Sequence, residues 1–223
     1  MVRGVLARRA LIVSLLVAFV ALSLAIPERG GTTIDIAVAN WLEAHDTDRG
    51  AVIFTWVSWL GDTALSGLLV AAALLLLHRR RPLAAATVVV ATVGGMLINP
   101  AIKPFFHRPR PDYAIEALAG QTFSFPSGHA MASIIGFGIV AFFRRGVEPE
   151  PVRRQLIVAA TCVIVLAVGF SRLYLGVHYF TDVLGGFLVG AVWLLLCIEG
   201  HHVASAVVGR ARHVSDAAEP PAP

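Results

Sequence analysis

The stretch YFTDVLGGFLVGAVWLLLCI, residues Tyr179 to Ile198, contains a single charged side chain, Asp182, close to its start. A transmembrane α-helix needs about 20 consecutive, mostly apolar residues to cross the hydrocarbon core of a bilayer, so this stretch predicts a membrane-spanning helix. The whole chain shares its character, because 57% of the 223 residues are hydrophobic and only 14% are charged. That is more apolar surface than one soluble core could bury, and it indicates an integral membrane protein.

Five other apolar stretches predict further spans: Ala10 to Ile26, Thr63 to Leu77, Leu83 to Ile102, His129 to Phe143 and Gln155 to Phe170. The predicted fold class is therefore all-α, a six-transmembrane helical bundle that forms one domain over residues 1–209. The first stretch could instead be a signal peptide that ends near Ala25, but it is longer than a usual signal core and favours a retained helix. Residues 210–223, which end in SDAAEPPAP, have too few apolar side chains for a core and are predicted to form a disordered tail.

The positive charges indicate how the spans are oriented. Arginines crowd the linkers HRRRP, residues 78–82, and RRGVEPEPVRR, residues 144–154, and recur near the N-terminus and in the tail. Because cytoplasmic loops carry an excess of Lys and Arg, both termini are predicted to be cytoplasmic in the cell membrane. The net charge of +4 is interpreted as these arginines meeting anionic headgroups and not as a nucleic-acid surface. From Thr33 to Asp46, apolar residues repeat with helical periodicity, which predicts an amphipathic helix on the outer surface.

Cations also lie on the opposite, outer side, where the positive-inside rule does not explain them. Lys103 and Arg110 belong to the predicted loop KPFFHRPRP, residues 103–111, which three prolines stiffen, and Arg172 lies at the outer end of the fifth predicted span. Any one of them alone could bind lipid headgroups. Together they are suited to a phosphate monoester, because Lys and Arg neutralise its two negative charges and donate hydrogen bonds to its oxygens.

The segment FPSGH, residues 125–129, stands at the outer end of the fourth predicted span. Pro126 is suited to the first turn of the helix. Ser127, Gly128 and His129 present backbone N–H groups at a positive helix end, where an anion is readily held, and Gly128 lets the anion approach the main chain. A serine helix cap would explain the serine but not the histidine. Because imidazole titrates near neutrality, His129 is suited to protonate a leaving group.

The segment SRLYLGVHYFTD, residues 171–182, leads into the last predicted span. His178 and Asp182 are four residues apart, so their side chains share one helix face and the carboxylate can accept a hydrogen bond from one ring nitrogen. The other nitrogen is then free to attack phosphorus and form a phosphohistidine. A pair that only caps the helix is the alternative.

The three segments together resemble the signature motifs of a known family. They are similar to the motifs of the type 2 phosphatidic acid phosphatase (PAP2) superfamily. The first is Lys103, six residues and Arg110-Pro111; the second is Pro126-Ser127-Gly128-His129; the third is Ser171-Arg172, five residues, His178, three residues and Asp182. This family includes membrane lipid phosphatases and is similar to vanadium-dependent haloperoxidases.

The resemblance implies a six-span bundle of the PAP2 and haloperoxidase-like type, with its active site on the extracytoplasmic face. It also implies hydrolysis of a phosphate monoester or diphosphate without a metal or other cofactor. His178 would be the nucleophile, Asp182 its partner and His129 the acid for the leaving group; Lys103, Arg110, Ser127, Gly128 and Arg172 would bind phosphate. For His107 and Arg108, contact with substrate and contact with headgroups both stay open.

The expected partner is a phosphorylated lipid that enters from the bilayer: undecaprenyl diphosphate, which the family favours, phosphatidylglycerol phosphate or phosphatidic acid. One alternative is a haloperoxidase-like enzyme, against which the number of spans argues. A second is a membrane transporter, but its ionisable residues would lie near mid-membrane and not at helix ends. A third is a metallohydrolase with His129, His178 and Asp182 as ligands, which the neighbouring cations disfavour. No nucleic-acid partner is expected, and the sequence leaves the oligomeric state open.

Overall fold

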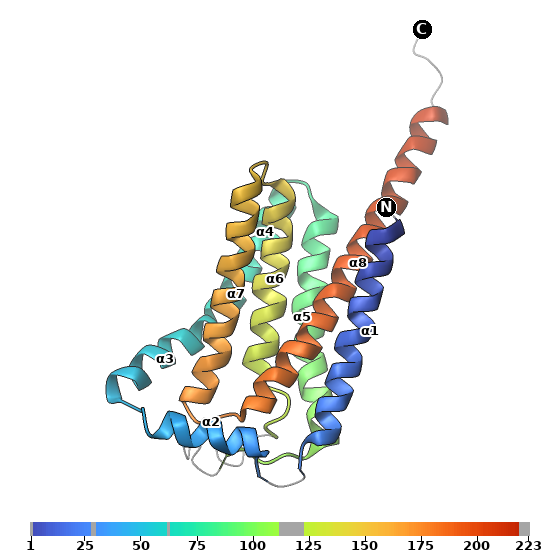
Figure 1. Ribbon diagram of the computed structural model, residues 1–223. Coiled ribbons are helices and arrows are strands. Elements are labelled where there is room, and N and C mark those ends of the chain that lie inside the picture. Colours follow the sequence, from blue (N-terminus) through green and yellow to red (C-terminus); the bar gives the residue numbers. More distant parts are fainter. Residues whose placement is uncertain (1, 28–29, 62, 112–122, 219–223) are drawn as a thin grey trace.

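The computed structural model describes residues 2–27, 30–61, 63–111 and 123–218, and within these residues every regular element is helical. The helices are α1 (Val2–Ala25), α2 (Thr33–Glu43), α3 (Asp48–Leu60), α4 (Thr63–His78), α5 (Pro82–Phe106), α6 (Gly128–Val147), α7 (Pro151–Tyr174) and α8 (Phe180–Ala218). The predicted all-α class is confirmed. The long helices stand side by side, α2 lies across one end of the bundle, and α3 leans outward from it (Figure 1).

Six candidate membrane spans are found in the described residues, the number that the sequence predicts: Gly4–Ala25, Asp48–His78, Pro82–Phe106, Gly128–Val147, Pro151–Tyr174 and Phe180–Ala211. The second differs most from the prediction, because it combines α3 with α4 and begins at Asp48 instead of Thr63. α3 ends with Gly61 as its C-cap, and the two helices leave this point in different directions (Figure 1). The predicted span corresponds to α4 alone, and the sequence pattern did not indicate that α3 belongs to the same span.

α6 lies at the centre of the bundle and packs against α8, α7, α5 and α4. The core that it shares with α4, α5 and α8 consists of Leu65, Leu69, Val88, Ala91, Met131, Ile135, Ile139 and Cys197. Between membrane helices, small residues let backbones approach closely, and a Cβ at Gly136 of α6 would lie 2.7 Å from the Leu65 side chain of α4. The central helix is therefore held on several sides.

α2 forms within the range for which the periodicity predicts a helix, but its apolar residues are divided between a buried face and an exposed face that carries Ile34 and Ile36. Thr32 and Asp35 form a capping box at its start, and Leu42 is buried whereas Trp41 is 57% exposed. Its buried face packs against α7 and α8. α2 therefore covers the end of the bundle at which α7 ends and α8 begins.

α8 differs from the prediction at its far end. It continues to Ala218, so residues 210–218 are helical where the sequence predicted a disordered tail. Ala and Arg are strong helix formers, and the first proline of this region is Pro220, which explains why the helix extends this far. The part of the predicted tail from residue 219 onward lies outside the described residues.

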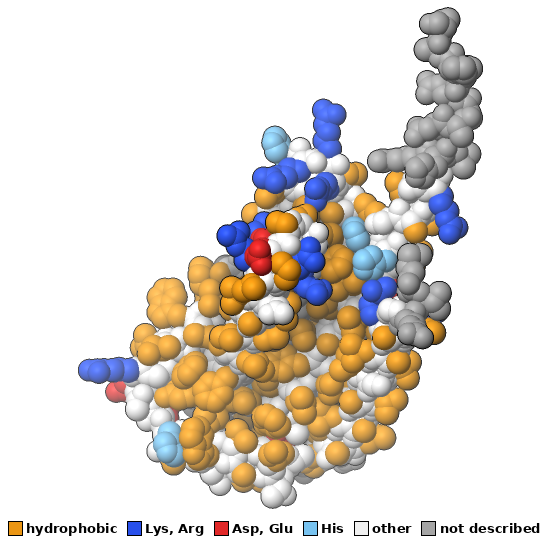
Figure 2. Space-filling model, turned by 45° about the horizontal axis from the view of Figure 1, so that its top comes forward, with side chains coloured by type: hydrophobic (Ala, Val, Ile, Leu, Met, Phe, Trp, Pro, Cys, Tyr) orange, Lys and Arg blue, Asp and Glu red, His pale blue; other side chains and the backbone are white. Residues whose placement is uncertain are grey.

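The two ends of the bundle differ in charge. α1 begins and α8 ends at the end that also holds the α4–α5 and α6–α7 linkers (Figure 1). Figure 2 shows Lys and Arg side chains gathered over this end, while hydrophobic side chains cover the flanks. There, Arg8 of α1 forms an ion pair with Glu199 of α8, with 2.8 Å between Nε and Oε2. The helix ends that carry the predicted site lie at the opposite end, beside α2.

Candidate active site

The eight predicted site residues lie where the C-terminal ends of α5 and α7 meet the N-terminal ends of α6 and α8. They are Lys103 in the last turn of α5, Arg110 after it, Ser127, Gly128 and His129 at the start of α6, Arg172 in the last turn of α7, His178 before α8, and Asp182 in its first turn. Lys103 was expected in a loop. α5 instead runs past Pro104 to Phe106 and fixes Lys103 on a helix.

The structure brings these residues into one cluster. The charges of Arg110, Asp182 and Arg172 all act on the Lys103 ammonium group. The charges of Arg172, Arg110 and Lys103 act on the His129 imidazole, as His178 also does. Residues from four helix ends therefore share one electrostatic environment, in which positive side chains outnumber the single carboxylate of Asp182.

His178 and Asp182 form a buried pair. The Nδ1 atom of His178 lies 3.4 Å from Oδ2 of Asp182, a long contact of the kind often seen in catalytic sites without substrate. The Tyr179 backbone N–H donates to the same carboxylate oxygen at 2.9 Å. The contact between Nδ1 of His178 and the Asp182 carboxylate favours a proton on Nδ1 and leaves the lone pair on Nε2.

His178 is held in its neutral form. Burial lowers its pKa to about 4, although the hydrogen bond and the charge of Asp182 raise it, and the positive charges of Arg110 and Arg172 lower it further. Desolvation disfavours the charged form of a histidine. At neutral pH the ring therefore keeps the unprotonated nitrogen that a nucleophile needs.

The start of α6 differs in two details from the sequence prediction. Ser127 is the N-cap of α6, so Pro126 precedes the helix and is not part of its first turn. The Ser127 N–H donates to the Asp182 carbonyl oxygen at 2.9 Å and so cannot bind an anion. Gly128 and His129 keep their places in the first turn, whose N–H groups have no partner within a helix. The buried Ser127 Oγ has no hydrogen-bond partner among the described residues.

Two neighbouring glycines let α8 approach the start of α6. A Cβ at Gly186 would lie 2.5 Å from the Ser127 carbonyl oxygen, and a Cβ at Gly185 would lie 2.3 Å from the Phe125 ring. Any side chain at Gly186 would push the backbone of the α6 N-terminus away from α8. Gly185 and Gly186 therefore allow the close contact between α8 and the start of α6 on which the geometry of the site depends.

Three further contacts position the site residues. Arg110 donates from Nη1 to the Val177 carbonyl oxygen at 2.8 Å, which joins the segment after α5 to the residue before His178. Arg172 donates to the buried hydroxyl of Ser58 on α3. Asn99 of α5 donates from Nδ2 to the Pro126 carbonyl oxygen at 3.3 Å. The sequence prediction did not include Ser58 or Asn99 in the site. Each is a polar residue within an apolar stretch, and such a residue in a membrane span often has a functional role.

The two residues left open by the sequence have different surroundings. His107 is exposed, and its ring packs edge-on against Phe123 with 4.8 Å between centroids. Arg108 is fully buried and forms ion pairs with Asp35 and Asp182. Arg108 therefore faces the protein interior, and neither a headgroup nor the bulk solvent can reach it.

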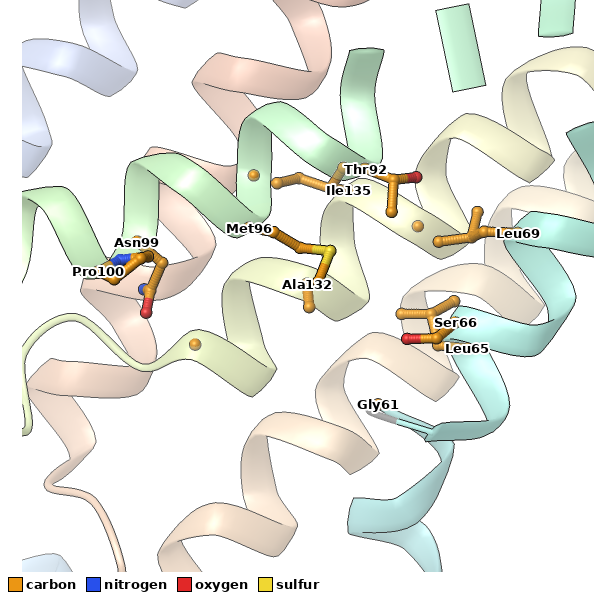
Figure 3. A pocket seen from close by; sticks show the side chains of 13 residues that line it. Gly61, Leu65, Ser66, Leu69, Thr92, Met96, Asn99, Pro100, Ala132 and Ile135 are labelled. Atoms are coloured by element: carbon orange, nitrogen blue, oxygen red, sulfur yellow. The ribbon is translucent and has the colours of Figure 1, made fainter. Parts of the chain in front are cut away.

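A cavity of about 240 Å³ adjoins the cluster at Gly128. It is lined from α4, α5 and α6, and Figure 3 shows Met96, Ala132 and Ile135 along it, with Asn99 and Pro100 at one end and Leu69 at the other. The lining residues Thr92 to Pro100 of α5 span about 12 Å at 1.5 Å per residue. Because Met96 is 67% exposed, the cavity opens on the flank of the bundle.

The fold and the site define a helical membrane protein with a cationic histidine–carboxylate site at one end of its bundle. The chain belongs to the PAP2 superfamily, whose family model matches residues 83–205. This match covers all three motif segments.

The chain is similar to one curated protein and to two solved structures. Phosphatidylglycerophosphatase B of Bacillus subtilis (strain 168) is 39% identical over 103 residues, which are 45% of this chain and 49% of that protein. The match thus spans about half the length of the curated relative. The crystal structure of a transmembrane PAP2-type phosphatidylglycerolphosphate phosphatase from Bacillus subtilis has a TM-score of 0.77 at 28% identity, over 86% of this chain and 96% of that one. Aquifex aeolicus LpxE, with a TM-score of 0.57 at 23% identity over 75% of this chain and 96% of that one, shares the fold.

Proposed function

We propose that this protein is a membrane lipid phosphatase that hydrolyses a phosphate monoester or diphosphate of a lipid through a phosphohistidine. The observation that carries the proposal is the buried, neutral His178, whose Nδ1 faces Asp182 within a cluster of three cations. An apolar cavity adjoins the same cluster. An anionic head and an apolar tail on one substrate would match these two neighbouring environments.

In the proposed first step, Nε2 of His178 attacks phosphorus. A P–N bond forms, the P–O bond to the lipid breaks, and His129, which the negative charge of the bound phosphate keeps protonated, donates a proton to the leaving oxygen. Asp182 stabilises the imidazole as it becomes positively charged. In the second step, His129 removes a proton from water, the water oxygen bonds to phosphorus, and the P–N bond breaks. The products are inorganic phosphate and a lipid with one phosphate fewer.

The proposed phosphate ligands are Lys103, Arg110 and Arg172, with the Ser127 hydroxyl and the N–H groups of Gly128 and His129. Fixed cations and helix N-termini stabilise the charge that develops on a transferring phosphoryl group. Arg110 and Arg172 are held by the Val177 carbonyl and by Ser58, so little reorganisation is needed when substrate binds. These positive charges supply the role that a metal ion has in other phosphatases, and we propose that no metal is required.

The cavity is the proposed site for the part of the lipid tail nearest the phosphate. Its length of about 12 Å is a little under half of the roughly 30 Å hydrocarbon thickness, so the remainder of a long tail would stay in the bilayer. The opening beside Met96 would let the lipid enter sideways from the membrane.

The proposed location is the cell membrane, with both termini in the cytoplasm and the site on the extracytoplasmic side. Support comes from the arginines, which gather at the end of the bundle opposite the site (Figure 2). Cytoplasmic segments carry such an excess of positive charge.

Phosphate release from a panel of lipids in detergent tests the function. The panel contains phosphatidylglycerol phosphate, the substrate in the names of the Bacillus subtilis proteins, together with phosphatidic acid and undecaprenyl diphosphate. We expect release from at least one lipid, unchanged by EDTA. Absence of release from every lipid would contradict the proposed function, and loss of release with EDTA would contradict the metal-independent mechanism.

A further inference from the structure

Arg108 lies at the centre of a buried network of charges beside the site. Its Nη1 is 2.6 Å from Oδ1 of Asp182, and its Nη2 is 2.8 Å from Oδ2 of Asp35. All three side chains are 0% exposed. The guanidinium carbon lies 4.3 Å from the centre of the Tyr179 ring. One arginine thus joins the surface helix α2 to the carboxylate that faces His178.

The two oxygens of Asp182 have different partners. Oδ1 accepts from Arg108, while Oδ2 accepts from the Tyr179 N–H and faces His178. A carboxylate held from both sides cannot rotate without breaking a charge-assisted hydrogen bond, which is stronger than a neutral one. Arg108 therefore determines how Asp182 meets the imidazole.

Asp35 holds Arg108 from the other side. Its Oδ1 accepts from the Thr181 N–H at 2.8 Å, and its Oδ2 accepts from the Thr32 N–H at 2.8 Å. Burial raises the pKa of Asp35, but these backbone hydrogen bonds and the hydrogen bond from Arg108 more than offset it, so the pKa is lowered. Asp35 is therefore an anion with a fixed position. Through the Thr181 N–H it also contacts the residue that precedes Asp182.

The burial of three charges argues for a role beyond stability. Removing a charged group from water costs several kcal/mol even after relaxation, and apolar side chains of similar volume often stabilise a protein as well or better. A network used only to fasten α2 to α8 would not need to include Asp182. The network instead ends on the carboxylate that faces the proposed nucleophile.

We propose that Arg108 and Asp35 are positioning residues for the phosphatase reaction: Asp35 fixes Arg108, and Arg108 orients Asp182 so that His178 keeps its proton on Nδ1 and directs Nε2 at phosphorus. This inference rests on the proposed function. It also gives α2 a functional role, because the buried Asp35 of this helix would hold Arg108 and thereby help to orient Asp182.

The kinetic test compares full-length Arg108→Met, Arg108→Lys and Asp35→Asn with wild type in detergent, using the best lipid phosphate of the panel. Because Arg108 touches no substrate, Arg108→Met should lower kcat by about 10- to 100-fold and change KM by less than about threefold. Arg108→Lys keeps the charge without the fork and should recover part of the loss. A raised KM with kcat intact would overturn the proposal, because it would indicate a substrate contact.

A second test needs no substrate. NMR of ¹⁵N-histidine-labelled protein in micelles reports which ring nitrogen carries the proton, and the His178→Ala protein identifies the His178 signals. We expect the Nδ1–H form in wild type and an increased Nε2–H form in Arg108→Met. Unchanged His178 signals in Arg108→Met would overturn the positioning role. Since this measurement does not depend on turnover, it separates failure of the inference from failure of the proposed function.

The matched control is Arg8→Met, which breaks the Arg8–Glu199 ion pair between α1 and α8 at the other end of the bundle. It removes an arginine and an ion pair to the same helix that carries Asp182. We expect wild-type kcat and wild-type His178 signals. If Arg8→Met lowered kcat as much as Arg108→Met, the effect would come from a general loosening of α8, and the inference would be wrong.

Discussion

A histidine that attacks phosphorus must be uncharged, and for His178 burial provides this condition. Asp182 alone would raise the pKa of His178, yet desolvation and the neighbouring Arg110 and Arg172 lower it to about 4. The same arginines are proposed to bind the substrate. The cations of the site would therefore have two effects, since they attract phosphate and keep the nucleophile unprotonated.

The pH dependence of the first chemical step should reflect this low pKa. With the His178 pKa at about 4, about nine-tenths of the imidazole is neutral at pH 5, whereas a histidine with the unperturbed pKa of about 6.5 would be only a few per cent neutral. We expect the rate of phosphoenzyme formation, measured by rapid quench in single turnovers, to fall less than about threefold between pH 7 and pH 5. A fall of tenfold or more, with a midpoint near pH 6.5, would contradict a buried neutral nucleophile.

Replacement of His178 tests the covalent intermediate. Without the imidazole no P–N bond can form, so His178→Ala should lower phosphate release by a factor on the order of 10⁴ or more. Wild type incubated with a ³²P-labelled lipid phosphate and quenched in alkaline detergent should carry label, and His178→Ala should not. His45→Ala, which changes an exposed histidine outside the site, is the control and should behave as wild type.

Single residues differ in how well the sequence predicts them. The spacing of His178 and Asp182 predicts their contact because both belong to one local segment. The Asp35–Arg108 pair joins residues 73 positions apart, and no local spacing predicts it. One signal was present, because Asp35 lies three and seven residues before Val38 and Leu42 and so shares their face of an amphipathic helix. An acidic residue on that face indicates a buried partner.

At the scale of elements, helix ends determine the geometry of the site. The sequence prediction ended two spans at Ile102 and Phe170, because charged residues follow. α5 and α7 continue to Phe106 and Tyr174, since the backbone hydrogen bonds of a helix persist where the side chains become polar. Lys103 and Arg172 are thereby placed on rigid helical turns. Rigid elements hold functional side chains more precisely than loops.

The close approach of α8 to α6 can be tested at Gly186. A Cβ at this position would lie 2.5 Å from the Ser127 carbonyl oxygen, and such overpacking costs about 1–3 kcal/mol. Gly186→Ala should lower the thermal unfolding midpoint in detergent and, by moving Ser127 from Asp182, lower kcat by about tenfold or more.

Gly200→Ala is the matched control for this substitution. Gly200 lies on the same helix, and a Cβ there would have nothing within 4 Å. Alanine is the better helix former by about 1 kcal/mol, so Gly200→Ala should leave both kcat and the unfolding midpoint equal to or above those of wild type. An equal loss in both variants would mean that α8 tolerates no change, and the close approach at Gly186 would not be the cause.

For the whole molecule, the number of spans could be predicted from composition, but the cavity could not. Its walls come from α4, α5 and α6 and from Gly61, the C-cap of α3, so segments that are far apart in the sequence together determine its shape. Apolar residues that line a cavity and apolar residues that face lipid have the same sequence pattern. Packing between distant segments decides which of the two they are.

Filling the cavity should separate lipid substrates from soluble ones. Ala132 lies on the cavity wall (Figure 3), and Ala132→Trp should lower turnover of a long-chain lipid phosphate by about tenfold or more. Hydrolysis of p-nitrophenyl phosphate, which has no tail, should change little. The control is Ala86→Trp, which places the same bulk in a cavity between α5 and α8. Equal losses on both substrates in Ala132→Trp would contradict a tail site.

The orientation in the membrane determines which lipids the site can meet. Both the start of α1 and the end of α8 lie at the arginine-rich end, and α2 covers the opposite end (Figures 1 and 2). With Cys162 and Cys197 replaced by alanine, we introduce His45→Cys near α2 or Pro149→Cys in the α6–α7 linker, both at exposed positions. A membrane-impermeant maleimide added to intact cells should label His45→Cys alone, and both variants should react after permeabilisation. Labelling of Pro149→Cys alone in intact cells would place the site on the cytoplasmic side, where only lipid phosphates of the inner leaflet could reach it.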